Sequence, residues 1–312
     1  MSLDLARMIV VGVDGSEDAL EALEYLDLIY RPKNKLEVQL LYILPSLPPI
    51  LVADQNRQSK LRLLDIESKS VQMAERILKE AKDILVQKGF REDHIKGVYR
   101  KKQIGIARDI CKFAGDKAAH ALLITKRGRS RLDAFLSGEI SSKIVDYCLT
   151  CPVWVVEGAV TSEKVLVAID SSENSLRAVE HAGFMLAGTD SHVTLFHSKR
   201  HLRGFLPREV IEAAPELEGI WKDTAGELIA PYLKKGKDVL IQSGLREEHI
   251  KTKVVEGSRS AAGDILREAR SNSFGTIVLG RKGRSSVKEY FMGTTTSKVL
   301  EDSRGLAVWV VH

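Results

Sequence analysis

The chain has 312 residues, which is enough for two domains of ordinary size, and 44% of its residues are hydrophobic. Its formal net charge of +5 is far below what a dedicated nucleic-acid-binding protein usually concentrates on one face. No apolar run approaches the roughly 18 residues of a membrane-spanning helix, no signal peptide is recognisable, and three cysteines are too few for a disulfide framework. We therefore expect a cytoplasmic protein without nucleic-acid or membrane partners.

The same pattern occurs twice along the chain. MIVVGVDGSEDALEAL, from Met8, matches KVLVAIDSSENSLRAV, from Lys164. Further on, GFREDHIK matches GLREEHIK, and KRGRSRLDAFLSGEISSKIV matches RKGRSSVKEYFMGTTTSKVL. Both halves end on a similar apolar strand, PVWVV and LAVWVV. The repeat indicates a duplication, and it predicts one domain over residues 1–157 and another over residues 163–312.

Short β-branched runs alternate with amphipathic stretches in each half. In the first half, the predicted strands are residues 8–13, 37–43, 95–101, 121–125 and 152–156, and the predicted helices are residues 19–29, 63–88, 106–118 and 140–149. In the second half, the predicted strands are residues 165–169, 193–197, 252–255, 276–279 and 307–311. This alternation predicts an α/β fold, with a parallel sheet and helices on both of its faces in each domain. Ligands bind such sheets beyond the carboxyl ends of the strands.

A glycine-rich segment with a run of hydroxyls follows the fourth strand of the second half. Gly280, Gly283 and Gly293 are followed by three threonines, Thr294 to Thr296, where the next helix is expected to begin. Glycine lets a backbone approach a ligand closely, and a helix N-terminus with nearby hydroxyls can donate to phosphate oxygens. The alternative is that the glycines only turn the chain and that Thr294 caps the helix.

The spacing G-x2-G-x9-G-T resembles the nucleotide motif of the universal stress protein family. The resemblance covers nearly the whole chain, because each half has five strands, an aspartate after the first strand and a terminal V-x-V-V strand. It implies two doubly wound domains with strand order 3-2-1-4-5, and ATP, with or without Mg, held between strands 1 and 4. Carried over by position, two residues would border the adenosine, namely Ala168 and Asp170. The residues that would surround the ribose and phosphates are Gly280, Lys282, Gly283, Gly293, Thr294, Thr295 and Thr296.

Asp170 also has a simpler interpretation, because short polar side chains in a sequence such as IDSSENS often cap a helix. The first half departs from the motif. Thr125 replaces the first glycine, and Glu139 stands where the second half has Thr294, although Gly128 and Gly138 keep their spacing. A carboxylate at a helix N-terminus is stabilised by the helix dipole and would occupy the place of an anion. We therefore predict one ATP per chain, bound by the second half.

Other signals favour structural roles. The chain has no G-x-G-x-x-G after a first strand and no G-x-x-x-x-G-K-[ST], which argues against a dinucleotide enzyme and a P-loop NTPase. Cys148 and Cys151 form a C-x-x-C pair, but they are better explained as small buried residues than as a redox or metal site. His94 and His249 are expected on the surface, at a turn before the third strand of each half. The run KRGRSR, from Lys126, is interpreted as a solvated loop, and the prolines of LPSLPPI as an extended loop after the second strand.

These observations predict an ATP-binding universal stress protein that acts as a stress-response regulator or sensor and is not an enzyme. One alternative is an interaction or scaffold protein of the same fold that binds no nucleotide. A slow ATP hydrolase is a third class, but it lacks an evident general base and paired carboxylates. The terminal strands of the two halves would form sheet edges, and we expect them to meet within one chain, with Trp154 and Trp309 buried there. A homodimer of the whole chain is a further option.

Overall fold

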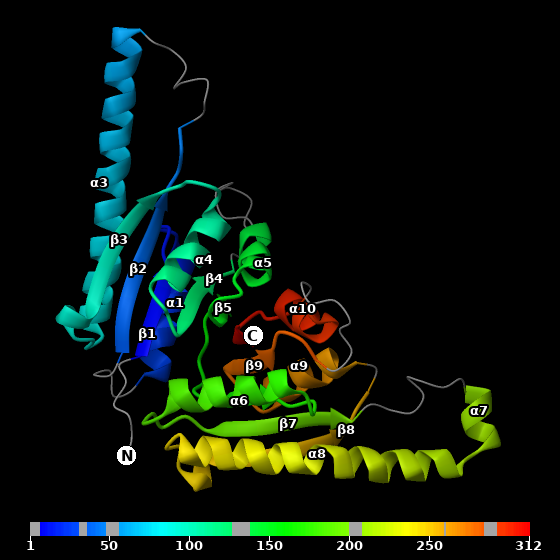
Figure 1. The fold of residues 1–312 in the computed structure, drawn as a ribbon. Coiled ribbons are helices and arrows are strands. Elements are labelled where there is room, and N and C mark those ends of the chain that lie inside the picture. Colours follow the sequence, from blue (N-terminus) through cyan, green and yellow to red (C-terminus); the bar gives the residue numbers. More distant parts are fainter. Residues whose placement is uncertain are drawn as a thin grey trace. The chain divides into compact units, whose positions relative to one another are not determined.

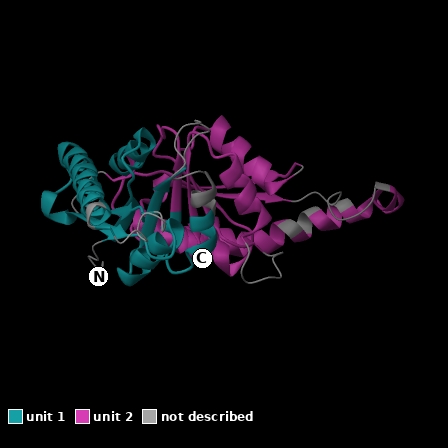
Figure 2. Ribbon diagram, turned by 90° about the horizontal axis from the view of Figure 1, so that it is seen from above, with its two compact units in different colours: residues 1–27, 33–153 teal, residues 28–32, 154–312 magenta. Residues whose placement is uncertain are grey.

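A computed structural model describes residues 7–30, 36–47, 56–126, 138–199, 208–258, 260–283 and 292–312. The chain forms two compact units, one from residues 1–27 and 33–153 and the other from residues 28–32 and 154–312 (Figure 2). No helix among the described residues combines the length and the hydropathy that a membrane crossing needs.

The first half contains a parallel sheet with the predicted strand order, β3-β2-β1-β4-β5 (Figure 1). Its strands are β1 (Arg7–Gly12), β2 (Leu36–Leu44), β3 (Ile95–Lys101), β4 (Ala121–Thr125) and β5 (Val153–Glu157). Its helices are α1 (Glu17–Ile29), α3 (Arg57–Gln87), α4 (Ile106–Asp116) and α5 (Gly138–Tyr147). The central strand β1 pairs in parallel with both β2 and β4. Its residues Ile9, Val10 and Val11 are fully buried, as expected for a strand covered on both faces.

The second half repeats this architecture, with strand order β8-β7-β6-β9-β10. Its strands are β6 (Val165–Ala168), β7 (Val193–Lys199), β8 (Ile250–Glu256), β9 (Thr276–Gly280) and β10 (Leu306–Val311). Its helices are α6 (Glu173–Leu186), α7 (Arg208–Ala213), α8 (Glu216–Gln242), α9 (Ala261–Ser271) and α10 (Thr294–Glu301). Right-handed crossovers with this strand order place α6 and α8 on one face and α9 and α10 on the other. The helix contacts agree, because α6 packs against α8 and α9 packs against α10.

Some boundaries differ from the predicted ones. The helix α3 begins at Arg57, six residues before the predicted start at residue 63. Residues 60–62 are exposed, so this part of the helix shows no core-facing periodicity in the sequence. Short 3-10 helices (Glu92–His94 and Glu247–His249) precede β3 and β8, so both histidines lie in the predicted turns. Most of the basic run that follows Lys126, and the end of the proline-containing loop, lie outside the described residues.

The three cysteines are buried and reduced, which fits the structural interpretation. The Sγ atoms of Cys148 and Cys151 are 3.6 Å apart. Hydrogen bonding with Cys148, together with burial, raises the pKa of the Cys111 and Cys151 thiols above its usual range, and this disfavours the reactive thiolate. Within the described part of the chain, no group of three potential ligands is arranged to hold a metal ion.

The two tryptophans of the terminal strands are fully buried, as predicted. Trp154 belongs to the second compact unit, where its ring stacks on that of Trp309 with the centroids 3.7 Å apart. The Trp154 Nε1–H group donates a hydrogen bond to His181 Nε2 at 3.0 Å. The pairing of the two domains stays a prediction.

Candidate functional site

A tight turn follows β6 and fixes Asp170. The Asp170 Oδ1 atom accepts hydrogen bonds from the backbone N–H (3.2 Å) and the hydroxyl (2.5 Å) of Ser172. The Ser172 hydroxyl oxygen in turn accepts from the Ser175 N–H at 3.1 Å, so Ser172 is the residue that caps α6. Asp170 therefore acts locally by holding the capping residue. Ser171, between them, has a φ of +56°, in the left-handed region that side chains rarely adopt.

The three glycines of the motif allow close approaches of the backbone. A Cβ on Gly280 would lie 2.9 Å from the backbone C and O atoms of Asn174 in the first turn of α6. A Cβ on Gly283 would lie 2.5 Å from Asp170 Oδ2, and one on Gly293 would lie 3.2 Å from the carbonyl oxygen of Arg281. None of the three has a positive φ. Their common property is thus the absence of a side chain, which brings the loop after β9 against Asp170.

The helix α10 begins without a side-chain cap. Its N-cap residue is Gly293, so the interpretation of Thr294 as the cap is wrong, and Thr294 is the first helical residue. The Gly293 N–H donates to the Arg281 carbonyl oxygen at 2.8 Å, which ties the helix start to the end of β9. Among the described residues no side chain caps this end, so the first-turn N–H groups and the helix dipole are available to an anion.

The three threonines of this turn differ in their surroundings. Thr294 is exposed and Thr295 is half-buried, so their hydroxyls lie at the open end of the helix. Thr296 is buried, and its hydroxyl donates to the Gly280 carbonyl oxygen at 3.0 Å. The Thr296 side chain therefore stabilises the loop, and only the backbone N–H of Thr296 is available to a ligand.

The remaining predicted residues lie on the same edge of the sheet. Ala168 is the half-buried last residue of β6 and lies opposite Phe196 of β7. Lys282 is half-buried, and it follows Arg281, which is only 2% exposed. The structure thus brings Asp170, Gly280, Gly283 and the start of α10 together around the carboxyl ends of β6 and β9. Residues 284–291 of the motif lie outside the described residues.

The first half keeps the turn after its first strand. The Asp14 Oδ1 atom accepts from the Ser16 N–H (3.0 Å) and the Ser16 hydroxyl (2.5 Å), as Asp170 does with Ser172. Thr125 is the last residue of β4 and occupies the position of Gly280. Gly138 and Glu139 begin α5, but the side chain of Glu139 and all of Gly128 lie outside the described residues.

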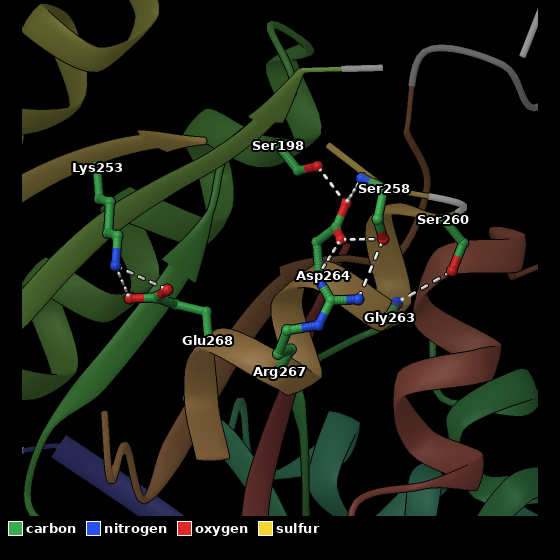
Figure 3. Close-up of polar contacts among 8 residues, drawn as sticks. All are labelled: Ser198, Lys253, Ser258, Ser260, Gly263, Asp264, Arg267 and Glu268. Carbon is green, nitrogen blue, oxygen red and sulfur yellow. Dashed lines mark hydrogen bonds and ion pairs between the residues drawn. The ribbon is translucent and has the colours of Figure 1, made fainter. Parts of the chain in front are cut away.

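The sequence interpretation missed a cluster of polar groups beside this site. Asp264, in the first turn of α9, is 4% exposed. It accepts hydrogen bonds from the Ser198 hydroxyl (2.6 Å), the Ser258 N–H (2.9 Å), the Ser258 hydroxyl (2.5 Å) and Arg267 Nη1 (3.0 Å) (Figure 3). Burial works to raise the pKa of Asp264, but these hydrogen bonds outweigh it and hold the pKa below its usual value. Ser198 and Asp264 are 66 residues apart, so no sequence spacing connects them.

One further polar side chain lies at the carboxyl end of the second strand in each half. In β7, the His197 Nδ1 atom lies 2.6 Å from the Ile169 carbonyl oxygen, next to Asp170. At the matching position of the first half, burial and the charge of Asp14 raise the pKa of Tyr42. Neither residue belongs to the glycine motif, and only the sheet pairing brings them to this edge.

The chain belongs to the Universal stress protein family, whose model matches residues 6–157 and again residues 161–312. Over 141 residues it is 25% identical to the universal stress protein YxiE of Bacillus subtilis (strain 168), a match that covers 44% of this chain and 90% of that protein.

Several solved structures resemble nearly the whole chain in fold. A universal stress protein from Archaeoglobus fulgidus DSM 4304 has a TM-score of 0.62 and 18% identity, and the match covers 98% of this chain and 96% of that one. A putative universal stress protein from Pseudomonas aeruginosa UCBPP-PA14 has a TM-score of 0.56 and 17% identity, and the match covers 99% and 94% of the two chains.

Proposed function

We propose that the second domain binds ATP, and that the protein acts in the cytoplasm as a stress-response regulator or sensor rather than as an enzyme. The observation that carries this proposal is the uncapped start of α10, which the Gly293–Arg281 hydrogen bond joins to the glycine loop after β9. Backbone N–H groups at a helix start, together with hydroxyls, form a common binding site for phosphate groups.

Each residue has a distinct task in this proposal. The N–H groups of the first turn of α10 and the hydroxyls of Thr294 and Thr295 donate to the phosphates. Lys282 supplies positive charge, and Gly283 keeps the space beside Asp170 clear of side-chain atoms. Asp170 accepts from ribose hydroxyls through an oxygen on the Gly283 side, while its Oδ1 atom stays with Ser172. Ala168 borders the adenosine.

The same residues argue for binding rather than hydrolysis. Among the described residues that line the site, Asp170 carries a carboxylate, and one of its oxygens is already committed to the turn before α6. Within the described residues, no three potential ligands gather to hold a metal ion, so any Mg would be held largely by the phosphates and water. We therefore assign no general base and no metal-activated water to this protein.

We also propose that the two domains pair within the chain through their terminal strands. The support is that Trp154 and Trp309, which lie on these strands, are both fully buried. This pairing would protect two apolar strands that would otherwise be open to edge-to-edge association.

Mass spectrometry of the small molecules released from the purified, denatured full-length protein tests the nucleotide assignment. We expect ATP, at close to one molecule per chain. A protein that releases no nucleotide, and that gives no heat when titrated with ATP, would instead be an interaction or scaffold protein of the same fold.

A further inference from the structure

The N-terminal part of the long helix α3 extends past the strands on which the rest of the helix packs (Figure 1). The core-facing line of α3 repeats every seven residues, through Leu85, Leu78, Val71 and Leu64. Leu85 and Leu78 are buried and Val71 is half-buried, but Leu64 is 62% exposed, and Leu61, one turn earlier, is exposed to a similar extent. The apolar side of the helix therefore continues beyond the point where the described part of the chain covers it.

The charges on this part of α3, residues 57–73, leave a positive excess, and we call it the basic arm. Its two carboxylates are each paired with a lysine, at 2.7 and 3.2 Å. Lys60 and Arg62 are both exposed, and neither forms an ion pair with any residue that the structure describes. The basic arm thus presents two cations without a partner beside exposed apolar side chains.

The matching part of the second half has the opposite charge. Residues 208–228, which form α7 and the first part of α8, contain six acidic and two basic residues, and we call them the acidic arm. Glu209, Glu216 and Glu227 are exposed, and within the described part of the chain none of the three belongs to an ion pair. The acidic arm therefore presents anions that lack a partner.

The acidic arm also exposes large apolar side chains. Ile220 is 60% exposed and Leu228 is 50% exposed. The next residue, Ile229, is buried in the core of its domain. Successive residues of a helix point about 100° apart, so Leu228 faces away from that core. An exposed apolar surface bordered by charges is typical of a protein interaction site.

We propose that the basic arm of one copy of the protein packs against the acidic arm of a second copy. This contact gives Lys60 and Arg62 carboxylate partners and removes apolar side chains from water in both copies. The helical parts have comparable lengths, since residues 57–73 span about 26 Å and residues 216–228 span about 20 Å at 1.5 Å per residue. Because every chain carries both arms, two copies related by a twofold axis make the contact twice.

Sedimentation velocity of the full-length protein over a wide range of concentrations tests this proposal. We expect a dimer that dissociates on dilution and that weakens as salt screens the charges. Lys60→Glu combined with Arg62→Glu should weaken association by about tenfold or more, because like charges then face each other. Lys79→Glu combined with Lys82→Glu is the matched control, since it makes the same change of charge on α3 outside the basic arm and breaks only surface ion pairs.

Reversing the charges of both arms separates a specific contact from a general effect of charge. Glu216→Lys combined with Glu227→Lys should weaken association as the basic-arm variant does, and a chain that carries all four substitutions should associate again. The four side chains are exposed, so thermal unfolding should show a folded protein in every case.

A protein that stays monomeric at all concentrations, or a dimer that the reversals do not weaken or do not restore, would overturn the proposal. A monomer that instead sediments with vesicles of anionic lipid would show that the basic arm binds a membrane surface, and this result would overturn it too. None of these outcomes depends on nucleotide binding, so the test is independent of the proposed function.

Discussion

The carboxyl edges of the two sheets share the same turn after the first strand. Asp14 and Asp170 each hold a serine two residues further on, with distances that agree within about 0.2 Å, and that serine accepts from an N–H group of the following helix. Since both halves keep this turn, the aspartate is explained by the fold, whether or not a nucleotide binds. An aspartate after the first strand is therefore weak support for a ligand.

The two edges differ where phosphates would lie. The second half has Gly280 at the end of its fourth strand and Thr294 at the start of the next helix, whereas the first half has Thr125 and Glu139 there. The fold tolerates a branched side chain at the end of this strand, because the first half contains one. In the second half, however, a Cβ on Gly280 would lie 2.9 Å from the backbone of Asn174, so packing against α6 already requires this glycine. The difference that points to a ligand is the uncharged helix start.

The largest expected effect is the loss of nucleotide binding in Gly283→Val. A Cβ here would lie 2.5 Å from Asp170 Oδ2, so the branched side chain would displace the carboxylate oxygen that is proposed to accept from the ribose. We expect ATP affinity to fall more than a hundredfold, measured by calorimetry, while the thermal unfolding profile still shows a folded domain. The matched control is Gly105→Val in the first half, where a Cβ would contact nothing within 4 Å. If Gly283→Val binds ATP normally, the glycine loop is not part of the nucleotide site.

A gain of function is the converse test of the same difference. If ATP entered the first half, Glu139 would repel the phosphates by roughly 3 kcal/mol per charge at about 5 Å and an effective dielectric constant of about 20. The double variant Thr125→Gly, Glu139→Thr removes both the charge and the branched side chain. We expect it to acquire a second, weaker ATP site in a calorimetric titration. If the double variant still binds one ATP per chain, other residues prevent ATP from binding to the first half.

The aspartates in the first turns of α9 and α4, Asp264 and Asp109, should differ in their contribution to stability. Asp264→Ala leaves the Ser198 and Ser258 hydroxyls and one N–H without their buried acceptor, so we expect a loss of about 3 kcal/mol of unfolding free energy. Among the described residues, its counterpart Asp109 accepts from N–H groups of a half-exposed loop, which water can replace, so Asp109→Ala should cost about 1 kcal/mol. Urea unfolding checks both variants, and equal losses would contradict the contrast.

The smallest expected effect is on the pH dependence of the stability. The pKa of Asp264 is lower in the folded protein than in the unfolded chain, so the folded state binds fewer protons near pH 4. Its stabilising contribution is complete above about pH 4 and is lost as the pH falls through the folded pKa. Urea midpoints between pH 6 and pH 3 should therefore fall less steeply in Asp264→Asn than in the unmodified protein. If the urea midpoints of the two proteins fall equally with pH, the charged form of Asp264 does not stabilise the folded state.

The sequence predicts most of the fold because each strand is a short, β-branched run and the whole pattern occurs twice. It places the start of α3 too late, since residues 60–62 are exposed and leave no periodic signal. The strand order came from the family resemblance, not from periodicity.

The glycines and hydroxyls of the candidate site are visible in the sequence, but their individual roles are not. Thr296 has the same residue type as Thr294 and Thr295, and only the structure shows that its hydroxyl is bound to the Gly280 carbonyl oxygen. The contact between Ser198 and Asp264 depends on how β7 and α9 pack, which no local pattern encodes.

Counting the nucleotides bound by one chain tests the asymmetry between the halves. Calorimetric titration of the unmodified full-length protein with ATP, at protein concentrations well above the dissociation constant, gives this number without any assumption about which residues bind. A single site per chain is the predicted result. Two equivalent sites would contradict the argument from Thr125 and Glu139, and an absence of binding would contradict the assignment of ATP to the second half.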